Sequence, residues 1–357
     1  MARHVADLEV IVNVRMSADE VESVALKMPR LRRLKCWAPL LPVDGPMLFP
    51  LGLHELEIWA FDRIFSAAEI NAVVAATSRL EQLQSLSLLI WRIDPLISFA
   101  PLAALPLFRL LSINVRIAAN LSHAQVEQLR ALPRLRTLNI HPVPASLLRR
   151  LLAQPHDLQW QRISLPSPLR DADTALLPRL PSLTSLDLNW RYLSGLDFLQ
   201  GLPNLSSLRC SSLRDGSGLR LTDRLVAALQ RCTDVTELHL DRCASLTAAH
   251  LAELLPRMPR LRSLGLSDLG IDSLSFLAQA PLTIRLSRLS LSGCKKLPVA
   301  ELRHVHSLLG LRELGIHDSF DEQMDPDCDE LTALRPPSAA LPLLESFTYY
   351  PHSFETD

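Results

Sequence analysis

The chain has 357 residues, of which 48% are hydrophobic and only 5% aromatic, and its formal net charge is −1. Such a balance provides no global field that would recruit nucleic acid or an acidic membrane surface, so we expect neither as a partner. No uncharged apolar run approaches the ~20 residues that a membrane-spanning helix needs. The apolar fraction instead suits a core built mainly from leucine.

One pattern recurs along the chain: an apolar residue, two variable residues, a second apolar residue, one variable residue and a third apolar residue. We assign fourteen such units, whose first residues lie 22 to 33 positions apart. Periods of about 20 to 29 residues are typical of leucine-rich repeats. In chain order the units are Val5-Leu8-Val10, Leu31-Leu34-Cys36, Leu53-Leu56-Ile58, Leu83-Leu86-Leu88, Phe108-Leu111-Ile113, Leu135-Leu138-Ile140, Trp160-Ile163-Leu165, Leu183-Leu186-Leu188, Leu205-Leu208-Cys210, Val235-Leu238-Leu240, Leu261-Leu264-Leu266, Leu286-Leu289-Leu291, Leu311-Leu314-Ile316 and Leu344-Phe347-Tyr349.

This spacing predicts the fold class. The second and third apolar residues of a unit are two positions apart, so they share one face of a strand. One strand cannot bury that face alone, whereas parallel stacking of the units merges their apolar residues into one core. We therefore expect an α/β fold: a single leucine-rich repeat domain over residues 1–357, a right-handed horseshoe with a parallel β-sheet on its concave face. Helices, 3₁₀ turns or extended segments are expected on the convex face.

The segments between the strands carry helix and turn signals. Capping-box pairs precede apolar-periodic runs at Ser17 with Glu20, Ser66 with Glu69 and Ser122 with Gln125. Thr222 and Thr247 are the expected caps of helices over 223–231 and 248–257. The two 22-residue steps, from Leu31 and from Leu183, leave room only for an extended segment or a short 3₁₀ turn. A proline lies two residues before the first apolar position in seven units, at Pro29, Pro106, Pro133, Pro181, Pro203, Pro259 and Pro342.

The N-terminal repeat begins within a few residues of Met1, and its pattern predicts a strand. The charges at Arg3, Asp7 and Glu9 interrupt the apolar run that a secretory signal peptide needs, so we expect no such signal. The last strand of a solenoid needs a cover, because it otherwise exposes core residues and unpaired backbone. We therefore expect either a preceding domain or edge-to-edge self-association at this repeat.

The six cysteines do not form a disulfide pattern. Cys36 and Cys210 occupy core positions, Cys243 and Cys294 occupy the turn after a strand, Cys232 ends an outer helix, and Cys328 is the one that we expect to be exposed. Dispersed and mostly buried cysteines fit a reducing compartment, so we expect a cytoplasmic location, with the nucleus also open.

Two stretches resemble one subclass of the repeat. Val235-Thr-Glu-Leu-His-Leu-Asp-Arg-Cys243 and Leu286-Ser-Arg-Leu-Ser-Leu-Ser-Gly-Cys294 each end a strand with a turn cysteine. Both are similar to the cysteine-containing repeats typical of F-box leucine-rich repeat proteins. The resemblance implies that the turn cysteine packs beneath the backbone, and that the repeats hold the substrate of a ubiquitin ligase of the SCF type. No F-box is recognisable before the first repeat.

The candidate partner-binding residues lie on the inner face of the first units. Trp37 and Trp59 occupy the same position in consecutive units, with Lys35 and Glu57 beside them, and exposed tryptophans often dominate binding energy. The alternative is that both are rim residues packed on neighbouring loops. Trp91 lies near the same edge two units further on, and Trp190 lies at the corresponding edge in mid-chain.

Three further features have plainer explanations. The central column of variable residues is small or polar from the fifth unit onward, which fits either a polar recognition groove or a solvated sheet face. His141, His239 and His317 lie three or four units apart, too far for one metal site. The acidic stretch 318–330 falls in the longest step, so we expect an inserted loop without the spacing of a calcium-binding loop.

The function expected from these patterns is protein binding on the concave face, with an unidentified protein as partner. The ubiquitin-ligase role is the first alternative, and activation of a small GTPase is a remote second. We expect no enzyme activity, no cofactor and no metal, because no nucleophile-elbow, zinc, phosphate-loop or kinase motif is present.

Overall fold

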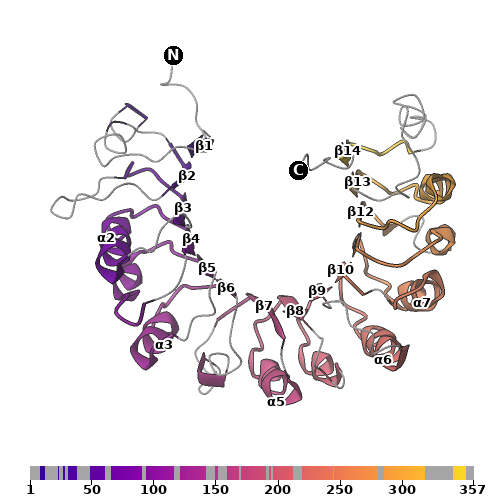
Figure 1. The fold of residues 1–357 in the computed structure, drawn as a ribbon, viewed down its shortest axis with the longest axis horizontal. Coiled ribbons are helices and arrows are strands. Elements are labelled where there is room, and N and C mark those ends of the chain that lie inside the picture. Colours follow the sequence, from indigo (N-terminus) through magenta and orange to yellow (C-terminus); the bar gives the residue numbers. More distant parts are fainter. Residues whose placement is uncertain are drawn as a thin grey trace, which may run out of the picture. The chain divides into compact units, whose positions relative to one another are not determined.

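The computed structural model describes residues 9–12, 23, 27–28, 31–37, 49–60, 66–90, 94–115, 121–141, 149–151, 159–168, 170–189, 193, 196–211, 219–243, 245–279, 285–317 and 341–350. The chain divides into two compact units, Met1–Ser167 and Pro168–Asp357. Both units are built from the same repeat, and within each the strands line one side while the helices line the other (Figure 1).

The strands of each unit follow one another in chain order and pair in parallel. The first unit has β1 (Glu9–Val12), β2 (Arg33–Trp37), β3 (Glu55–Ala60), β4 (Ser85–Ile90), β5 (Leu110–Val115), β6 (Thr137–His141) and β7 (Arg162–Pro168), which ends at the unit boundary. The second has β8 (Ser185–Asn189), β9 (Ser207–Ser211), β10 (Glu237–Asp241), β11 (Ser263–Ser267), β12 (Arg288–Ser292), β13 (Glu313–His317) and β14 (Ser346–Tyr350).

The strand register confirms the repeat assignment. Within each unit the second apolar residue of one repeat lies opposite the second apolar residue of the next, as Leu238 opposite Leu264 and Leu264 opposite Leu289. Leu138 and Leu264 are each only 1% exposed. The three apolar positions therefore face the core, whose burial provides the main stabilisation.

The assignment of the first repeat was wrong by two residues. Val10 of β1 lies opposite Leu34, and Val12 lies opposite Cys36, so Val10 and Val12 hold the second and third apolar positions. We had placed Leu8 and Val10 there. Residues two apart share a strand face, so periodicity alone could not distinguish these registers.

The described helices connect successive strands. They are α2 (Ala67–Thr77), η2 (Ala100–Ala104), α3 (His123–Arg130), α5 (Asp171–Thr174), η4 (Leu177–Arg179), η5 (Asp197–Gly201), α6 (Leu219–Leu229), α7 (Ala248–Leu254), η6 (Leu255–Arg257), η7 (Ser275–Ala278) and η8 (Val299–Ser307), where η denotes a 3₁₀ helix. Among the described residues of the short step after Leu183, η5 is the one helical element, in agreement with the expected 3₁₀ turn. In the second unit α6, α7, η7 and η8 pack against one another in sequence, so each repeat supports its neighbour.

Three of the predicted helix caps are confirmed. Ser66 and Ser122 cap α2 and α3 in reciprocal capping boxes with Glu69 and Gln125, and Thr247 caps α7. Thr222 is not a cap, because α6 already begins at Leu219, directly after the glycine-rich stretch. The proposed cap at Ser17 lies outside the described residues.

Tight turns return the outer segments to the sheet. In Leu180-Pro181-Ser182-Leu183, for example, the Leu183 N–H donates to the Leu180 carbonyl (3.1 Å). Proline suits the second position of such a turn, because its fixed φ is already correct there and no N–H is lost from the turn. This accounts for the recurring proline two residues before the first apolar position.

The fold is a leucine-rich repeat solenoid of the α/β class. Its strands and core follow the repeat across both units, and its connections are helices and short 3₁₀ turns, as predicted. No helix in the described part of the chain has the length and apolarity to span a bilayer. The expected acidic loop at 318–330 is not among the residues described.

Candidate functional site

The first unit brings three of the predicted partner-binding residues together. Lys35 on β2 lies opposite Glu57 on β3, with its Nζ 4.0 Å from Glu57 Oε2. The Trp59 indole Nε1–H donates to Glu57 Oε1 (2.7 Å). Trp59 is half-buried, so its ring is partly available to a partner while one edge is fixed by the carboxylate. The arrangement is a half-exposed aromatic side chain held in place by a charged neighbour.

The other predicted binding residues are placed less completely. The backbone of Trp37 lies opposite that of Trp59, as the sequence predicted. The side chains of Trp37, Trp91 and Trp190 lie outside the described set, so their roles stay predictions. Leu89 follows Trp59 in the same column on β4 and is also half-buried. The column therefore holds one further apolar residue beyond the tryptophan, and Asn114 on β5 follows it.

The strand face of the second unit is different, because its central column carries only glycine or serine on β11, β12 and β13. Gly265 on β11, Ser290 on β12 and Gly315 on β13 follow His239 on β10 in this column. Of these, His239, Ser290 and Gly315 line a hollow of about 320 Å³ that reaches Thr348 on β14. The His239 ring leans across Gly265, where an added Cβ would lie 2.1 Å from His239 Nδ1. Serine and glycine at these positions leave space where the preceding strands of the same unit carry Asp187, Arg209 and His239.

Charged residues surround this hollow and affect His239. Burial lowers the pKa of His239, and the nearby Arg209 lowers it further, while Glu237 and Asp187 act in the opposite direction. At the far edge of the face, burial raises the pKa of Asp241, and Asp268 and Asp187 add to this, against Arg242 and Arg209. At neutral pH His239 is therefore an uncharged hydrogen-bonding group within a charged surround.

A second hollow of about 250 Å³ adjoins the first at the N-terminal edge of the strands. The two share Glu237, Ser263, Arg288 and Glu313. Arg288 Nε lies 3.0 Å from Glu313 Oε1, so part of this charge is paired across neighbouring strands. Together the hollows form a groove from the strand edge to the centre of the face. The sequence left a polar recognition groove open as one interpretation of this central column, but it did not indicate which strands the groove would occupy.

The opposite edge of the second unit has an unusual backbone. Arg242 (φ 55°), Asp268 (φ 49°) and Gly293 (φ 61°) follow β10, β11 and β12 at matching positions in the left-handed region. Each donates its N–H to the last strand residue of the next repeat: Ser267, Ser292 and His317, at 2.8, 2.7 and 2.9 Å. These bonds hold two non-glycine residues in an uncommon conformation. Beneath the turns, the Cys243 and Cys294 thiols donate to the carbonyls of Asp241 and Ser292 (3.4 and 3.6 Å).

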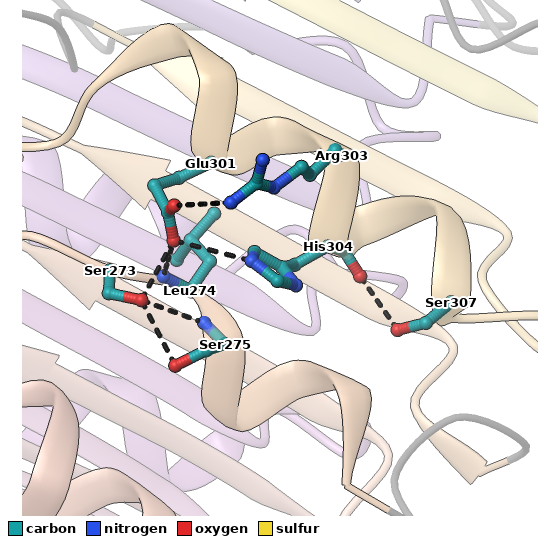
Figure 2. Close-up of polar contacts among 7 residues, drawn as sticks. All are labelled: Ser273, Leu274, Ser275, Glu301, Arg303, His304 and Ser307. Atoms are coloured by element: carbon teal, nitrogen blue, oxygen red, sulfur yellow. Dashed lines mark hydrogen bonds and ion pairs between the residues drawn. The ribbon is translucent and has the colours of Figure 1, made fainter.

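A polar cluster on the helical side combines serine, glutamate and histidine (Figure 2). Ser273 Oγ and the Leu274 N–H both donate to Glu301 Oε2, at 2.7 and 2.9 Å, while His304 Nε2 lies 3.5 Å from the same oxygen. A nucleophilic serine needs a base within hydrogen-bond reach, usually histidine. Here Ser273 donates to the carboxylate, and His304 meets the carboxylate rather than the serine. The cluster therefore links η7 to η8 and lacks the arrangement of a catalytic triad.

The buried thiols among the described residues are protonated rather than reactive. Burial raises the pKa of Cys36 to about 12 and that of Cys294 to about 11, so both remain protonated at neutral pH. Five described cysteines are free thiols. The described residues contain no group of three or more histidine, cysteine or acidic side chains that could hold a metal ion.

Comparison with known proteins adds structural likenesses only. No family model and no curated protein matches the chain. Among solved structures, it is similar to an internalin (InlF) of Listeria monocytogenes, with 13% identity over 87% of this chain and 86% of that one and a TM-score of 0.39. It is also similar to the complex of Rad7 and Elc1 from yeast, with 16% identity over 87% of both chains and a TM-score of 0.47. A third match is the complex of TLR13 with ssRNA13, at 18% identity over 82% of this chain but 57% of that one, with a TM-score of 0.37. Likenesses this distant say nothing about what this chain binds.

Proposed function

We propose that the chain is a protein-binding module whose partner docks on the strand face of the first unit. The observation that carries this proposal is the arrangement of Trp59, Glu57 and Lys35. Binding hot spots are commonly aromatic residues surrounded by polar groups. Trp59 is half-exposed, and its hydrogen bond to Glu57 limits the rotamers that a partner would otherwise have to order. The proposal includes no catalytic step.

The location that we propose for this interaction is inside the cell. The described cysteines are free thiols rather than disulfides, which fits a reducing compartment. The groove of the second unit is a separate polar surface. The proposal for Trp37, whose backbone lies opposite Trp59, extends the same surface by one repeat.

The test is partner capture with matched variants. Quantitative affinity purification should recover specific proteins with the wild-type chain, and Trp59→Ala should lose them. With a purified partner, this variant should bind more weakly by about 2 kcal/mol, or roughly thirtyfold. Leu96→Ala removes an apolar side chain that is 76% exposed, between β4 and η2, and serves as the control. Retention of every partner by Trp59→Ala would reject this surface.

A second candidate function rests on the turn cysteines. Cys243 and Cys294 are buried beneath the turns after β10 and β12, as the resemblance to the cysteine-containing repeat subclass implies. That resemblance supports substrate recognition in a ubiquitin ligase. Recovery of ligase scaffold subunits in the same purification would favour this function. Their absence, with another partner recovered in stoichiometric amount, would reject it.

A further inference from the structure

A third hollow in the second unit is lined by three arginines, and none of the described residues that line it is a carboxylate. It has a volume of about 290 Å³ and lies at the N-terminal edge of β10–β12, lined by Thr236, Pro259, Arg260, Leu261, Arg262 and Arg285. Three guanidinium groups on two consecutive repeats thus border one space. Because guanidinium groups cannot lose their charge in proteins, the hollow is cationic at all physiological pH values.

Of the three arginines, Arg262 has the fewest hydrogen-bond and ion-pair partners for its guanidinium group. Its neighbours in the same column, Thr236 and Ser287, each donate a hydroxyl hydrogen bond to the preceding repeat, to the carbonyls of Ser206 and Arg262 (both 3.1 Å). Arg262 interrupts this series and extends into solvent instead. Within the described part of the chain, its side chain has no ion pair and no hydrogen bond. Its charge is therefore available to a ligand.

The other two arginines are already oriented toward the same region. Arg285 donates to the carbonyl of Pro259, which fixes its guanidinium beside the hollow. Arg260 lies 2.9 Å from Asp234, but their side chains are 67% and 56% exposed. Exposed ion pairs contribute little stability, so a ligand that competes with Asp234 loses little.

The arginine-lined hollow continues into the groove on the strand face. It shares Thr236 and Arg262 with the 250 Å³ hollow, which in turn shares Glu237 and Ser263 with the hollow over Ser290 and Gly315. A ligand bound at Arg262 through one group therefore has a path along a floor of glycine and serine. Glu237 lines both the 250 Å³ and the 320 Å³ hollow, so its carboxylate places negative charge along this path beyond the arginines.

We propose that the arginine-lined hollow binds a phosphate monoester carried on a partner polypeptide, whose chain continues into the glycine–serine groove. This inference rests on the proposed protein-binding function and specifies the partner's chemistry. A phosphate has three strong acceptor oxygens and more than one negative charge near neutral pH. A carboxylate has only two oxygens to share among three guanidinium groups. Arginine clusters are a common means of recognising phosphorylated segments, through paired N–H···O bonds.

The test uses defined peptides rather than an unknown partner. A short fluorescein-labelled glycine–serine peptide with one central phosphoserine is compared with its unphosphorylated twin and with a twin carrying glutamate there. Fluorescence anisotropy at low ionic strength measures binding to the full chain. We expect the phosphopeptide to bind about tenfold tighter than the unphosphorylated twin, or more, since hydrogen bonds to charged groups are stronger than those between neutral groups. The glutamate peptide should lie between them.

Two variants and one control locate the site. Arg262→Ala and Arg262→Glu should both reduce phosphopeptide binding to the level of the unphosphorylated twin, and circular dichroism confirms that they fold. Arg179→Ala is the control, because Arg179 is likewise exposed and ends η4 in the same unit. It should bind the phosphopeptide as the wild type does.

Three results would overturn the proposal: equal binding of both peptides, phosphopeptide binding that survives Arg262→Glu, or inorganic phosphate that competes as strongly as the phosphopeptide does. The last would mean that the hollow takes free phosphate and that the groove adds nothing. These outcomes are independent of the Trp59 test. If Trp59→Ala loses its partners while no phosphopeptide binds, the protein-binding function stands and the phosphate site is rejected.

Discussion

His239 shows how single residues determine the chemistry of the strand face. Its ring can lean over the floor of the groove only because Gly265 has no Cβ. Burial and Arg209 lower its pKa from the ordinary 6.5, so protonation is disfavoured in the folded state. The unfolded chain therefore binds more protons than the folded chain over the range between the lowered and the ordinary pKa. Stability should rise with pH through this range, and the folded state is penalised below it.

We predict that His239→Gln reduces the loss of stability on acidification. Denaturant midpoints of the wild type and the variant, compared over about pH 7 to 5, should converge or cross, because glutamine carries no proton to gain. In Arg209→Ala the NMR titration of His239 should move to higher pH, since one cause of the lowered pKa is removed. If the wild type and His239→Gln lost the same amount of stability on acidification, this interpretation would be contradicted.

Neighbouring elements are joined by side chains that satisfy the backbone of the next repeat. Gln125 of α3 donates to the carbonyls of Asp94 and Ile97 (2.8 and 2.9 Å), in the segment before η2. Glu301 of η8 makes the corresponding link toward η7 in the second unit (Figure 2). The hydrogen bond from Ser273, and then that from the Leu274 N–H, lower the pKa of Glu301. The ionised form is thus favoured by folding.

We predict that Glu301→Gln destabilises the fold by about 1 kcal/mol at neutral pH, because charge-assisted hydrogen bonds are roughly twice as strong as neutral ones. A lowered folded pKa gives stability that is present above the ordinary carboxylate value and is lost as pH falls through the folded value. The difference between the two proteins in urea midpoint should therefore shrink in acid. Arg303→Gln is the control, since that arginine is 69% exposed and should contribute little. A larger effect from Arg303→Gln than from Glu301→Gln would reject this explanation.

The elements differ in how far the sequence alone predicts them. The apolar triplet predicted the strands and their register, because each such residue has to be buried against its neighbours, and capping residues predicted the starts of α2, α3 and α7. Strand periodicity could not distinguish Leu8 from Val10 as the second apolar position of the first repeat.

The candidate sites were predicted less completely than the fold. Matching positions in consecutive repeats were enough to bring Lys35, Glu57 and Trp59 together. The arginine-lined hollow was missed, because it depends on which arginine has a carboxylate within reach. That is a matter of side-chain placement rather than of pattern. Arginines at Arg260, Arg262 and Arg285 around two consecutive turns were the available signal.

At the scale of the whole chain, repeat architecture makes stability a sum of local terms. Each repeat contacts mainly its sequence neighbours, so free energy is distributed among repeats and the interfaces between them. The described contacts follow this pattern, with β10 paired to β9 and β11, and α7 packed between α6 and η7. Damage to one repeat should therefore spread to its neighbours and weaken with distance along the chain.

We predict that Leu264→Ala, which empties a core position only 1% exposed, costs about 3 kcal/mol and acts locally. Amide hydrogen exchange should accelerate most in β10, β11 and β12, because Leu264 lies opposite Leu238 and Leu289. Strands β3 to β5 of the first unit should keep their wild-type rates. Leu309→Ala, at a site 55% exposed, is the matched control and should change neither stability nor exchange appreciably. Uniform acceleration over both units would mean that the chain unfolds as one cooperative body, and the additive description of its repeats would then fail.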